Sequence, residues 1–544
     1  MNPSEGAIVL CLWVGVIKRV VEEISPVAHY SGVSIQEIPP HPNDGIDQNV
    51  ANLEEVALNN LQAILYQADI ELLKKWLPIL CSALKTGKLG ELVLMGYAQY
   101  ATGDHEALRA TLRSLEAQFP DEYRRDLINF ESSLLRIRNE FTFGNFETVD
   151  EIYSTLPLFE DYPFKRVNDF HLSKHRASLV AAFYLQDKGK FNKHFGAIEK
   201  FFASDFGSIE HLQVSSFKAM RAFMNGSYLE ANEYALSAIK LSYELKVSGA
   251  YTPFEAAYIL ADTYLEFGED KKSSEISEKY LALAIEFKQY PWITAFYSKT
   301  SILKLQEGNI NGALSLIRKG RESINGPLFN SNLSFPLDIH EILIRLPVGD
   351  IERIIEILHR LPNTELKQMY QSMLEFMKNP SGSFHIIQNI PDENDQDKFR
   401  KESFLAMVNL GNPPKAKEYL KSAIKYAEKN GFFRSFLNMP PEVRSLILDI
   451  ASETPTIFLE KLSTAIREQS SAAKSNPAGD HIPLTKRELD VLRRLGTNEP
   501  ITKIAASLHI SNNTIKTHLK NVYRKLSVES RDEAVARGKE LSLL

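Results

Sequence analysis

The chain has 544 residues, 44% of them hydrophobic and 24% charged, which is ordinary for a globular protein in water. That length is too great for one hydrophobic core, so we expect two to four domains. Only two cysteines occur, Cys11 and Cys81, which excludes a disulfide framework or a cysteine-rich zinc site and favours a cytoplasmic location. The net charge of −6 divides unevenly, because residues 481–544 carry +5 and the other residues −11. A small basic segment beside a large acidic one indicates that one part of the chain meets a polyanion.

Residues 1–50 form an N-terminal segment that we expect to be partly linker. The apolar run AIVLCLWVGVI at 7–17 is too short to span a bilayer. Its cations, Lys18 and Arg19, follow the run, whereas those of a signal peptide precede it. We therefore expect no membrane association, and interpret the run as a buried helix or as sequence ahead of the true start. The stretch EIPPHPNDGIDQN at 37–49 is rich in turn-forming residues and is typical of a loop or linker.

Residues 51–450 are helical in pattern and contain a repeat. Short turn signals, such as ATGDHEAL and MNGSYLEA, recur between amphipathic stretches at successive spacings of 41, 45, 37, 42, 40 and 41 residues. They centre on seven glycines and two weaker members, namely Gly103, Gly144, Gly189, Gly226, Gly268, Gly308 and Gly349, then Gly382 and Gly411. A small residue often follows four or five positions later, as at Ala107, Ala231, Ala313 and Ala416.

These features predict a stack of helical hairpins. Glycine permits the positive φ of the turn that ends the first helix, and alanine allows the second helix to pack close to it. Because no single hairpin can bury its apolar face, the hairpins are expected to form a tetratricopeptide-like solenoid with a continuous core. The alternative is an unrelated helical bundle with accidental glycine spacing. A solenoid presents a long concave surface, which suits the binding of a small molecule or a partner protein.

A second break occurs at 468–480, EQSSAAKSNPAGD, where small and polar residues accompany Pro and Gly. We therefore predict a flexible linker over residues 451–480. A compact helical domain is expected to follow it over residues 481–544.

The C-terminal domain is predicted to contain four helices with recognisable caps. The first, in LTKRELDVLRRL, opens with a capping box formed by Thr485 and Glu488, and the last opens with Ser530 and Glu533. Ser511 is expected to cap the third helix. Apolar residues at helical spacing supply the core of the domain, namely Leu489, Val491, Leu492, Leu495, Ile504, Ala505, Leu508, Ile515, Leu519, Val522 and Leu526.

The third helix, within ISNNTIKTHLKNVYRKL at 510–526, has two opposed faces. At 100° per residue its apolar residues form one stripe, and the segment contains no Asp or Glu. The side opposite the stripe carries Asn513, Lys516, Thr517, Lys520 and Arg524. A cationic, hydrogen-bonding face on a helix held by a small core fits the major groove of double-stranded DNA.

The start of the same helix suits a phosphate. Ser511, Asn512 and Thr514 supply polar side chains and free backbone N–H groups close to the helix N-terminus. The alternative interpretation of the whole helix is a solvated lysine-rich face without a ligand.

The segment 484–535 resembles the LuxR-type helix-turn-helix family, whose pattern LT-x-RE, IA-x-x-L-x-IS-x-x-T-I-K-x-H, KL and SR it matches. The resemblance implies that the third helix enters the major groove and that the fourth helix, 530–542, pairs two domains. It places base contacts on Lys516, Thr517 and Lys520, and backbone contacts near Ser511, Asn513, Thr514 and Arg524. It also implies a structural place for His518 rather than metal ligation. The chain departs from the family at Pro500, where a glycine-rich turn usually precedes the second helix.

Helical repeats followed by this domain are similar to the MalT-like subset of the family, and LQAILYQADIELLKKWLPIL at 61–80 is similar to the segment that leads into its sensor. Those proteins usually begin with a nucleotide-binding domain. This sequence contains no G-x-x-x-x-G-K-[ST] motif, so we do not expect ATP-dependent switching. Zinc, calcium, serine-hydrolase and dinucleotide motifs are incomplete, so no enzyme activity, metal or cofactor is expected.

Together these patterns predict an all-α, cytoplasmic transcription regulator with a helical-hairpin solenoid followed by a four-helix helix-turn-helix domain. Its expected partners are double-stranded DNA, on which it forms a homodimer, the transcription machinery, and an unknown small-molecule or protein effector at the repeat surface. One alternative is a repeat scaffold or adaptor whose basic C-terminal domain binds an acidic protein. Another is a DNA-binding protein that its solenoid inhibits until a partner protein binds.

Overall fold

The computed structural model describes residues 61, 64–83, 87–117, 122–156, 167–200, 202, 208–325, 330–346, 350–362, 365–378, 392, 394–475, 484, 486–497, 499–508, 510–526 and 528–540. Every regular element in these ranges is a helix, which confirms the all-α prediction. The interpretations of 7–17 and 37–49, and the predicted turns at Gly349 and Gly382, lie outside the described residues.

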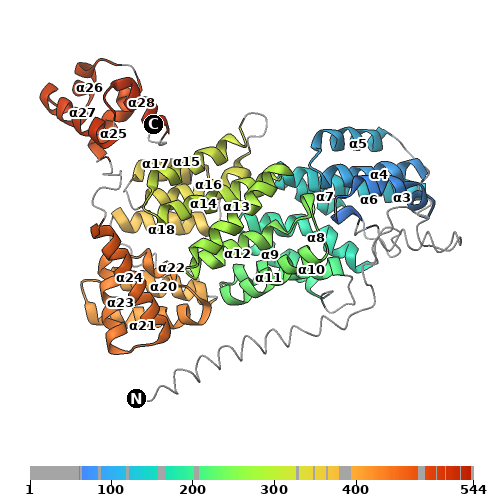
Figure 1. Cartoon of the computed structure of the whole chain (residues 1–544), viewed down its shortest axis with the longest axis horizontal. Helices are drawn as coiled ribbons and strands as arrows, with labels where there is room; N and C mark the ends of the chain where they lie inside the picture. Colours follow the sequence, from blue (N-terminus) through green and yellow to red (C-terminus); the bar gives the residue numbers. More distant parts are fainter. Residues whose placement is uncertain are drawn as a thin grey trace.

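The body of the molecule is a succession of antiparallel helix pairs (Figure 1). Its first half contains α3 (Ile70–Ala83), α4 (Gly87–Ala101), α5 (His105–Ala117), α6 (Glu122–Thr142), α7 (Phe146–Thr155), α8 (Val167–Tyr184), α9 (Lys188–Glu199), α10 (Ser208–Met224), α11 (Tyr228–Glu244), the 3-10 turn η2 (Gly249–Tyr251), α12 (Phe254–Glu266) and α13 (Asp270–Glu286). Its second half contains α14 (Tyr290–Gln306), α15 (Ile310–Glu322), α16 (Ser331–Arg345), α17 (Ile351–Arg360), α18 (Glu365–Lys378), α20 (Asp395–Val408), α21 (Pro413–Asn430), α22 (Arg434–Leu437), α23 (Pro441–Glu453) and α24 (Ile457–Ser475).

The glycine turns predicted from the sequence recur with one geometry. Gly103 has φ +71°, and the N–H of the next residue, Asp104, donates to the carbonyl of Gln99 five residues earlier at 2.9 Å. This is the bond of a Schellman helix end, which requires a left-handed residue before the donor. The same positive φ and five-residue bond occur at Gly144, Gly226, Gly268 and Gly308.

Gly189 does not make the turn that the sequence predicted for it. It lies inside α9, and the left-handed residue between α8 and α9 is Gln186, with φ +56°. Asp187 then makes the five-residue bond to Ala182, at 2.9 Å. The prediction failed by three residues because the hydrogen bonds of the motif, rather than glycine, define the turn, and here a non-glycine residue adopts the left-handed conformation. Gly411 lies between α20 and α21 without a positive φ.

The core of the body extends beyond neighbouring repeats. One hydrophobic cluster runs from Phe130 on α6 to Ile466 on α24, and smaller clusters cover the two ends. The late helices also fold back on earlier ones, because Ser435 on α22 donates its N–H to Glu266 on α12 at 2.8 Å. Lys188 on α9 pairs with Asp397 on α20 at 3.2 Å. The array is therefore braced between distant repeats and is more closed than a simple linear solenoid.

The linker predicted over residues 451–480 is wrong for its central part. Residues 457–475 form α24, and Leu459, Leu462 and Ile466 on it are buried in the main cluster. The apolar spacing of three and four residues in this segment holds it against the body, although its C-terminal half is rich in Ser and Ala.

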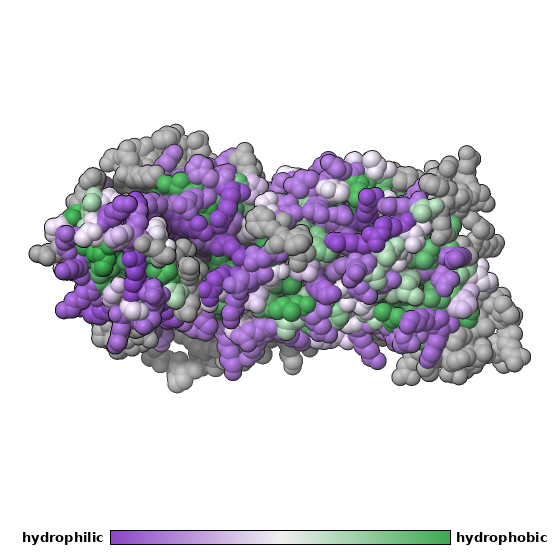
Figure 2. All heavy atoms as spheres, turned by 90° about the horizontal axis from the view of Figure 1, so that it is seen from above, coloured by the Kyte–Doolittle hydropathy of each residue, from purple (hydrophilic) through white to green (hydrophobic). Residues whose placement is uncertain are grey.

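The outer surface is mainly polar. Figure 2 shows a face on which hydrophilic residues dominate and apolar residues form small separate patches. None of the described helices is both long and apolar enough to cross a lipid bilayer.

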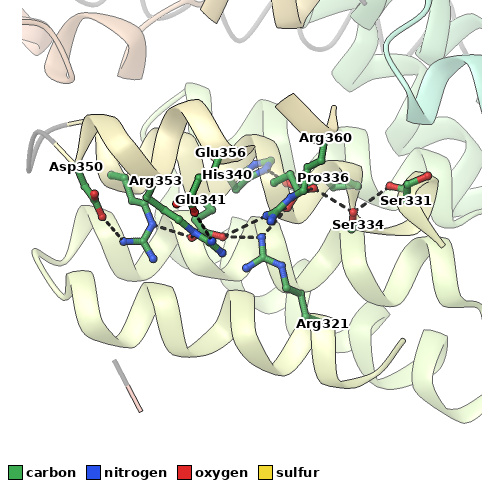
Figure 3. Close-up of polar contacts among 12 residues, drawn as sticks. Arg321, Ser331, Ser334, Pro336, His340, Glu341, Asp350, Arg353, Glu356 and Arg360 are labelled. Atoms are coloured by element: carbon green, nitrogen blue, oxygen red, sulfur yellow. Dashed lines mark hydrogen bonds and ion pairs between the residues drawn. The ribbon is translucent and has the colours of Figure 1, made fainter. Parts of the chain in front are cut away.

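Buried carboxylates join α15, α16 and α17 (Figure 3). Glu341 on α16 is 1% exposed and pairs with Arg321 at 2.5 Å, Arg345 at 2.7 Å and Arg353 at 3.2 Å. Asp338, one turn earlier, is 2% exposed and receives hydrogen bonds from Arg321 and Arg360, both at 2.6 Å. Two carboxylates thus hold arginines from three helices.

The arginines decide the charge state of Glu341. Burial alone raises the pKa of this carboxyl, but the attraction of Arg321, Arg345 and Arg353 outweighs burial and lowers the pKa to about 2. A carboxyl whose pKa is lower in the folded than in the unfolded chain stabilises the fold above the unfolded pKa, about 4.3. That contribution is lost as the pH falls from there toward 2.

We predict that Glu341→Gln destabilises the repeat body by about 3–5 kcal/mol at pH 7, because it leaves buried guanidinium groups without their carboxylate. The midpoint of thermal unfolding measures the loss, and the gap between variant and native chain should narrow below about pH 4.3. The matched control is Glu356→Gln, at an exposed carboxylate that also pairs with Arg353 and contributes at most about 1 kcal/mol. Equal effects of the two substitutions would contradict the role of burial.

Candidate nucleic-acid interface

The described residues from 484 onward fold into α25 (Lys486–Leu495), α26 (Ile501–Ser507), α27 (Asn512–Leu526) and α28 (Arg531–Glu540). In Figure 1 they form a separate unit beside α17. The hydrophobic cluster of this unit contains Val491, Leu492, Leu495, Ile504, Ala505, Ile515, Leu519, Val522, Leu526 and Ala534. Leu508 packs against the cluster while partly exposed. Leu489 is only partly buried and lies outside the cluster, because it lies off the face of α25 that Val491, Leu492 and Leu495 bury. The prediction that it belongs to the core is therefore wrong.

The helix α27 presents two faces with different environments. Ile515, Leu519 and Val522 are buried against α25 and its neighbours. The side chains predicted to meet DNA are exposed at Ser511, Asn512, Thr514, Lys516, Thr517, Lys520 and Arg524. Asn513 lies in the helix, but its side chain is outside the described part. His518, between the two faces, is half-buried.

Ser511 caps this helix, as the sequence predicted. Its Oγ accepts a hydrogen bond from the backbone N–H of Thr514 at 3.1 Å, and the two hydroxyl groups lie 2.7 Å apart. A side-chain oxygen at this position satisfies one of the N–H groups that a helix start leaves free. The first turn of α27 is therefore fixed with polar groups facing outward.

A buried ion pair joins α25 to α27. Lys525 Nζ lies 2.6 Å from Glu488 Oε2, and the two side chains are 8% and 4% exposed. The sequence interpretation assigned Glu488 to a capping box with Thr485, which lies outside the described residues. Its carboxylate instead reaches across to α27, so its second role was missed. The pair fixes the rotation of α27, and hence the direction of the exposed cations.

Arg531, at the start of α28, holds the other end of the domain. Its guanidinium donates to the carbonyl of Leu495 at 2.9 Å and to that of Glu499 at 2.8 Å. It therefore satisfies carbonyl groups at the C-terminus of α25 and just before Pro500, the residue that precedes α26. The family pattern includes Ser530 and Arg531, but the sequence did not predict which groups Arg531 contacts. Ser530 caps α28 as predicted, because its Oγ accepts from the N–H of Glu533 at 3.2 Å, and the Glu533 carboxylate accepts from the N–H of Glu529 at 3.0 Å.

Among the described residues, an arginine of α25 forms ion pairs with the body. Arg493 on α25 lies 3.5 Å from Asp350 and 3.3 Å from Glu352, at the start of α17. Lys516, Thr517 and Lys520 remain exposed in this arrangement. The described residues of the body therefore leave the outer face of α27 open. No three His, Cys, Asp or Glu side chains among the described residues gather where they could hold a metal ion.

We predict that Glu488→Ala destabilises the C-terminal domain by about 3–5 kcal/mol, because the largely buried Lys525 ammonium loses that carboxylate. Hydrogen–deuterium exchange of peptides from 486–540 in the whole chain measures the effect, with the repeat body as internal reference. The double change Glu488→Leu/Lys525→Met should recover most of the protection. Glu529→Ala, at an exposed carboxylate of the same domain, is the control, and equal exchange in both single variants would refute the prediction.

Comparison with known proteins agrees with this geometry. Residues 482–537 match the family model described as bacterial regulatory proteins, luxR family. The chain is 30% identical over 141 residues to the CsgBAC operon transcriptional regulatory protein of Escherichia coli K12, which covers 26% of this chain and 63% of that protein. It is 27% identical over 161 residues to the HTH-type transcriptional regulator MalT of Vibrio cholerae, which covers 26% of this chain and 18% of that protein. The chain thus spans less than two thirds of each relative.

A solved structure, a Rap protein complexed with competence and sporulation factor, aligns with 66% of this chain and 99% of its own, with a TM-score of 0.40 and 12% identity.

The segment 482–537 that matches the luxR family model contains α25, α26 and α27 and most of α28, including every predicted DNA-contacting residue. Residues 482–537 therefore form a DNA-binding domain of the luxR family of bacterial regulatory proteins, joined to a body of helical repeats.

Proposed function

We propose that the chain is a sequence-specific transcription regulator of the cytoplasm, whose repeat body senses an effector and whose C-terminal domain binds operator DNA. The observation that carries the proposal is the exposed face of α27. It presents Lys516, Thr517 and Lys520 free of any acidic neighbour on its helix, while the opposite stripe is buried. A helix with this division of faces, held by a small core, is the form in which proteins read base edges in the major groove.

The exposed residues divide into two roles. Lys516 and Lys520 can donate to guanine O6 and N7, and Thr517 can meet a thymine methyl group or a base-edge acceptor. The residues around the helix start and Arg524 bind phosphates and fix the orientation, namely Ser511, Asn512, Asn513, Thr514 and Arg524. The domain's net charge of +5, from 481 to 544, supports attraction to the DNA backbone.

Pairing of two domains through α28 supplies the affinity that one small domain lacks. Asp532, Glu533, Ala536 and Arg537 on α28 are exposed, whereas Ala534 is buried in the domain. A two-fold pair would place two copies of α27 about one helical turn of DNA apart. Linking two weak sites raises the affinity through effective concentration, by about 10²–10⁴. An effector that changes the self-association of the body would therefore change operator occupancy.

We predict that Lys516→Ala/Lys520→Ala abolishes sequence selection by the whole chain. In the test, fragmented genomic DNA is incubated with the protein at about 0.15 M salt, and the DNA that stays bound is sequenced. The native chain should enrich a roughly two-fold motif that the double variant does not. Arg524→Ala should instead weaken binding to all sequences and reduce the dependence on salt by about one charge.

The matched control is Lys461→Ala, at an exposed lysine of α24 in the body, which should leave the enriched motif unchanged. If neither the native chain nor its C-terminal fragment selects a sequence, the DNA proposal falls. An acidic protein partner at the same cations then takes its place.

The contact of Arg493 with the body predicts a small restraint on the domain. Half-exposed ion pairs contribute at most about 1 kcal/mol, so Glu352→Gln should raise the DNA affinity of the whole chain by no more than about five-fold. Glu356→Gln on the same helix pairs within the body and should have no effect. Fluorescence anisotropy with a labelled operator fragment measures both. A fragment of residues 481–544 that binds a hundred-fold more tightly per site than the whole chain would show inhibition by the body, contrary to this prediction.

A further inference from the structure

A pocket opens inside the repeat body where five segments meet. It lies between α4, α6, α8, the η2–α12 connection and α14. Aromatic side chains form much of its wall, among them Tyr100, Tyr251 and Trp292. Two arginines also line it, Arg138 from α6 and Arg176 from α8. Arginines and aromatic rings in one cavity are typical of a site for a ligand that has an anionic group on a carbon frame.

Arg138 has no acidic partner in the described part of the chain. Its guanidinium carbon lies 5.6, 5.7 and 5.5 Å from the ring centroids of Tyr97, Tyr100 and Tyr251. Burial raises the pKa of each of these phenols above its ordinary value, so all three are neutral near pH 7. The rings hold the cation in place without neutralising it. A half-buried cation in this state retains most of its attraction for an anion.

The carboxylates near the pocket have partners other than Arg138. Arg176 pairs with Glu255 at 3.0 Å, and its second terminal nitrogen is buried without a described partner. Glu131 lies on the same face of α6 as Arg138 but seven residues earlier, about 10 Å along the helix. Its carboxylate accepts a hydrogen bond from the Tyr97 hydroxyl and pairs with neither arginine. Arg138 and the second terminal nitrogen of Arg176 are therefore the donors that remain for a bound anion.

The start of α12 adds to the positive potential. Thr252 and Glu255 line the pocket from either side of the first residue of this helix, Phe254. The residue before the helix is Pro253, which has no side-chain group to satisfy the free N–H groups of the first turn. The positive end of the helix dipole thus faces the same cavity as Arg138.

The size of the pocket limits what it can hold. The cavity has a volume of about 40 Å³, enough for about three waters or for a carboxylate group with one or two carbons. A planar singly charged group matches both the volume and the fork of a guanidinium.

We infer that this pocket binds the carboxylate of an organic acid, either a small free acid or the C-terminal carboxylate of a peptide, with Arg138 as its ion-pair partner. The aromatic walls receive the carbon frame next to the carboxylate. The inference deepens the proposed function, because it names the chemistry of the effector that the repeat body senses. Binding of the acid itself does not depend on the proposed function, but its role as an effector does.

The test uses the purified whole chain and needs no DNA, so its failure is separate from failure of the DNA proposal. Thermal unfolding is followed while propionate or the peptide Gly-Gly-Gly is titrated, each beside its amide. A carboxylate that binds the folded chain raises the unfolding midpoint, and the neutral amide does not. Stabilisation by propionate alone assigns the site to small acids, and stabilisation by the peptide acid assigns it to peptide ends. If neither acid shifts the midpoint relative to its amide, the inference is overturned.

Variants at Arg138 separate binding from folding. Arg138→Met should weaken the acid roughly ten-fold to a hundred-fold by calorimetry, and Arg138→Lys should weaken it less. The midpoint of the ligand-free Arg138→Met chain should stay level or rise, because the substitution removes an unpaired cation. Arg136→Met on the same helix, where the arginine is exposed and pairs with Glu116, should leave binding unchanged. A lower ligand-free midpoint for Arg138→Met together with native acid affinity would make Arg138 a structural residue and overturn the proposal.

Discussion

The two buried carboxylates of α16 are the constraint on which the arrangement of the second half of the body depends. Asp338 and Glu341 gather arginines from α15, α16 and α17, so these helices cannot change their angles without separating buried opposite charges. The same network continues outward, because Arg345 also pairs with Asp350 at 2.7 Å, and Asp350 lies 3.5 Å from Arg493 of the DNA-binding domain. A buried charge cluster of the body thus reaches the surface at the point where the domain touches it.

The pocket and the domain contact are joined through packed helices. Trp292 of α14 lines the pocket, and its ring lies edge-on to that of Tyr184, with the centroids 6.3 Å apart. The hydroxyl of Tyr184 lies 2.7 Å from that of Thr294, two residues after Trp292 on α14. The Tyr184 hydroxyl also donates to the carbonyl of Leu333 on α16, at 3.1 Å. Since α16 carries Glu341 and Arg345, the ligand pocket, the charge cluster and the domain contact lie on one continuous set of contacts. Such continuity gives a physical route for coupling, and only an element with two arrangements turns it into a switch.

The sequence could predict those features of the fold that depend on residues close together in the chain. Positive φ at Gly103, Gly144 and Gly226 follows from the Schellman bond that ends each first helix, and this bond needs only residues within one turn. Gln186 shows the limit of that reasoning, since the same bond forms around a residue without glycine's freedom. The helix α24 was mistaken for linker because its C-terminal half is polar, although three residues of its first half are buried against distant helices.

In the C-terminal domain, too, local features could be predicted and long-range contacts could not. The stripe of Ile515, Leu519 and Val522 follows from helical spacing, and so do the exposed cations on the opposite face. The roles of Glu488 and Arg531 do not follow from spacing, because each acts on a residue more than thirty positions away. Arg138 and its pocket could not be predicted at all. Its surroundings come from five segments that only the packing of the repeats brings together.

The sizes of the expected changes in DNA affinity indicate how the body can control the domain. The contacts of Arg493 are partly exposed, so masking through them changes affinity by about five-fold at most. Pairing of two domains changes it by about 10²–10⁴. In this arrangement the predicted base-contacting residues are already exposed, so little remains to be unmasked. Control of DNA binding by the repeat body therefore has far more range through self-association than through covering the recognition helix, and an effector in the pocket would act most strongly by altering which surfaces of the body meet a second copy.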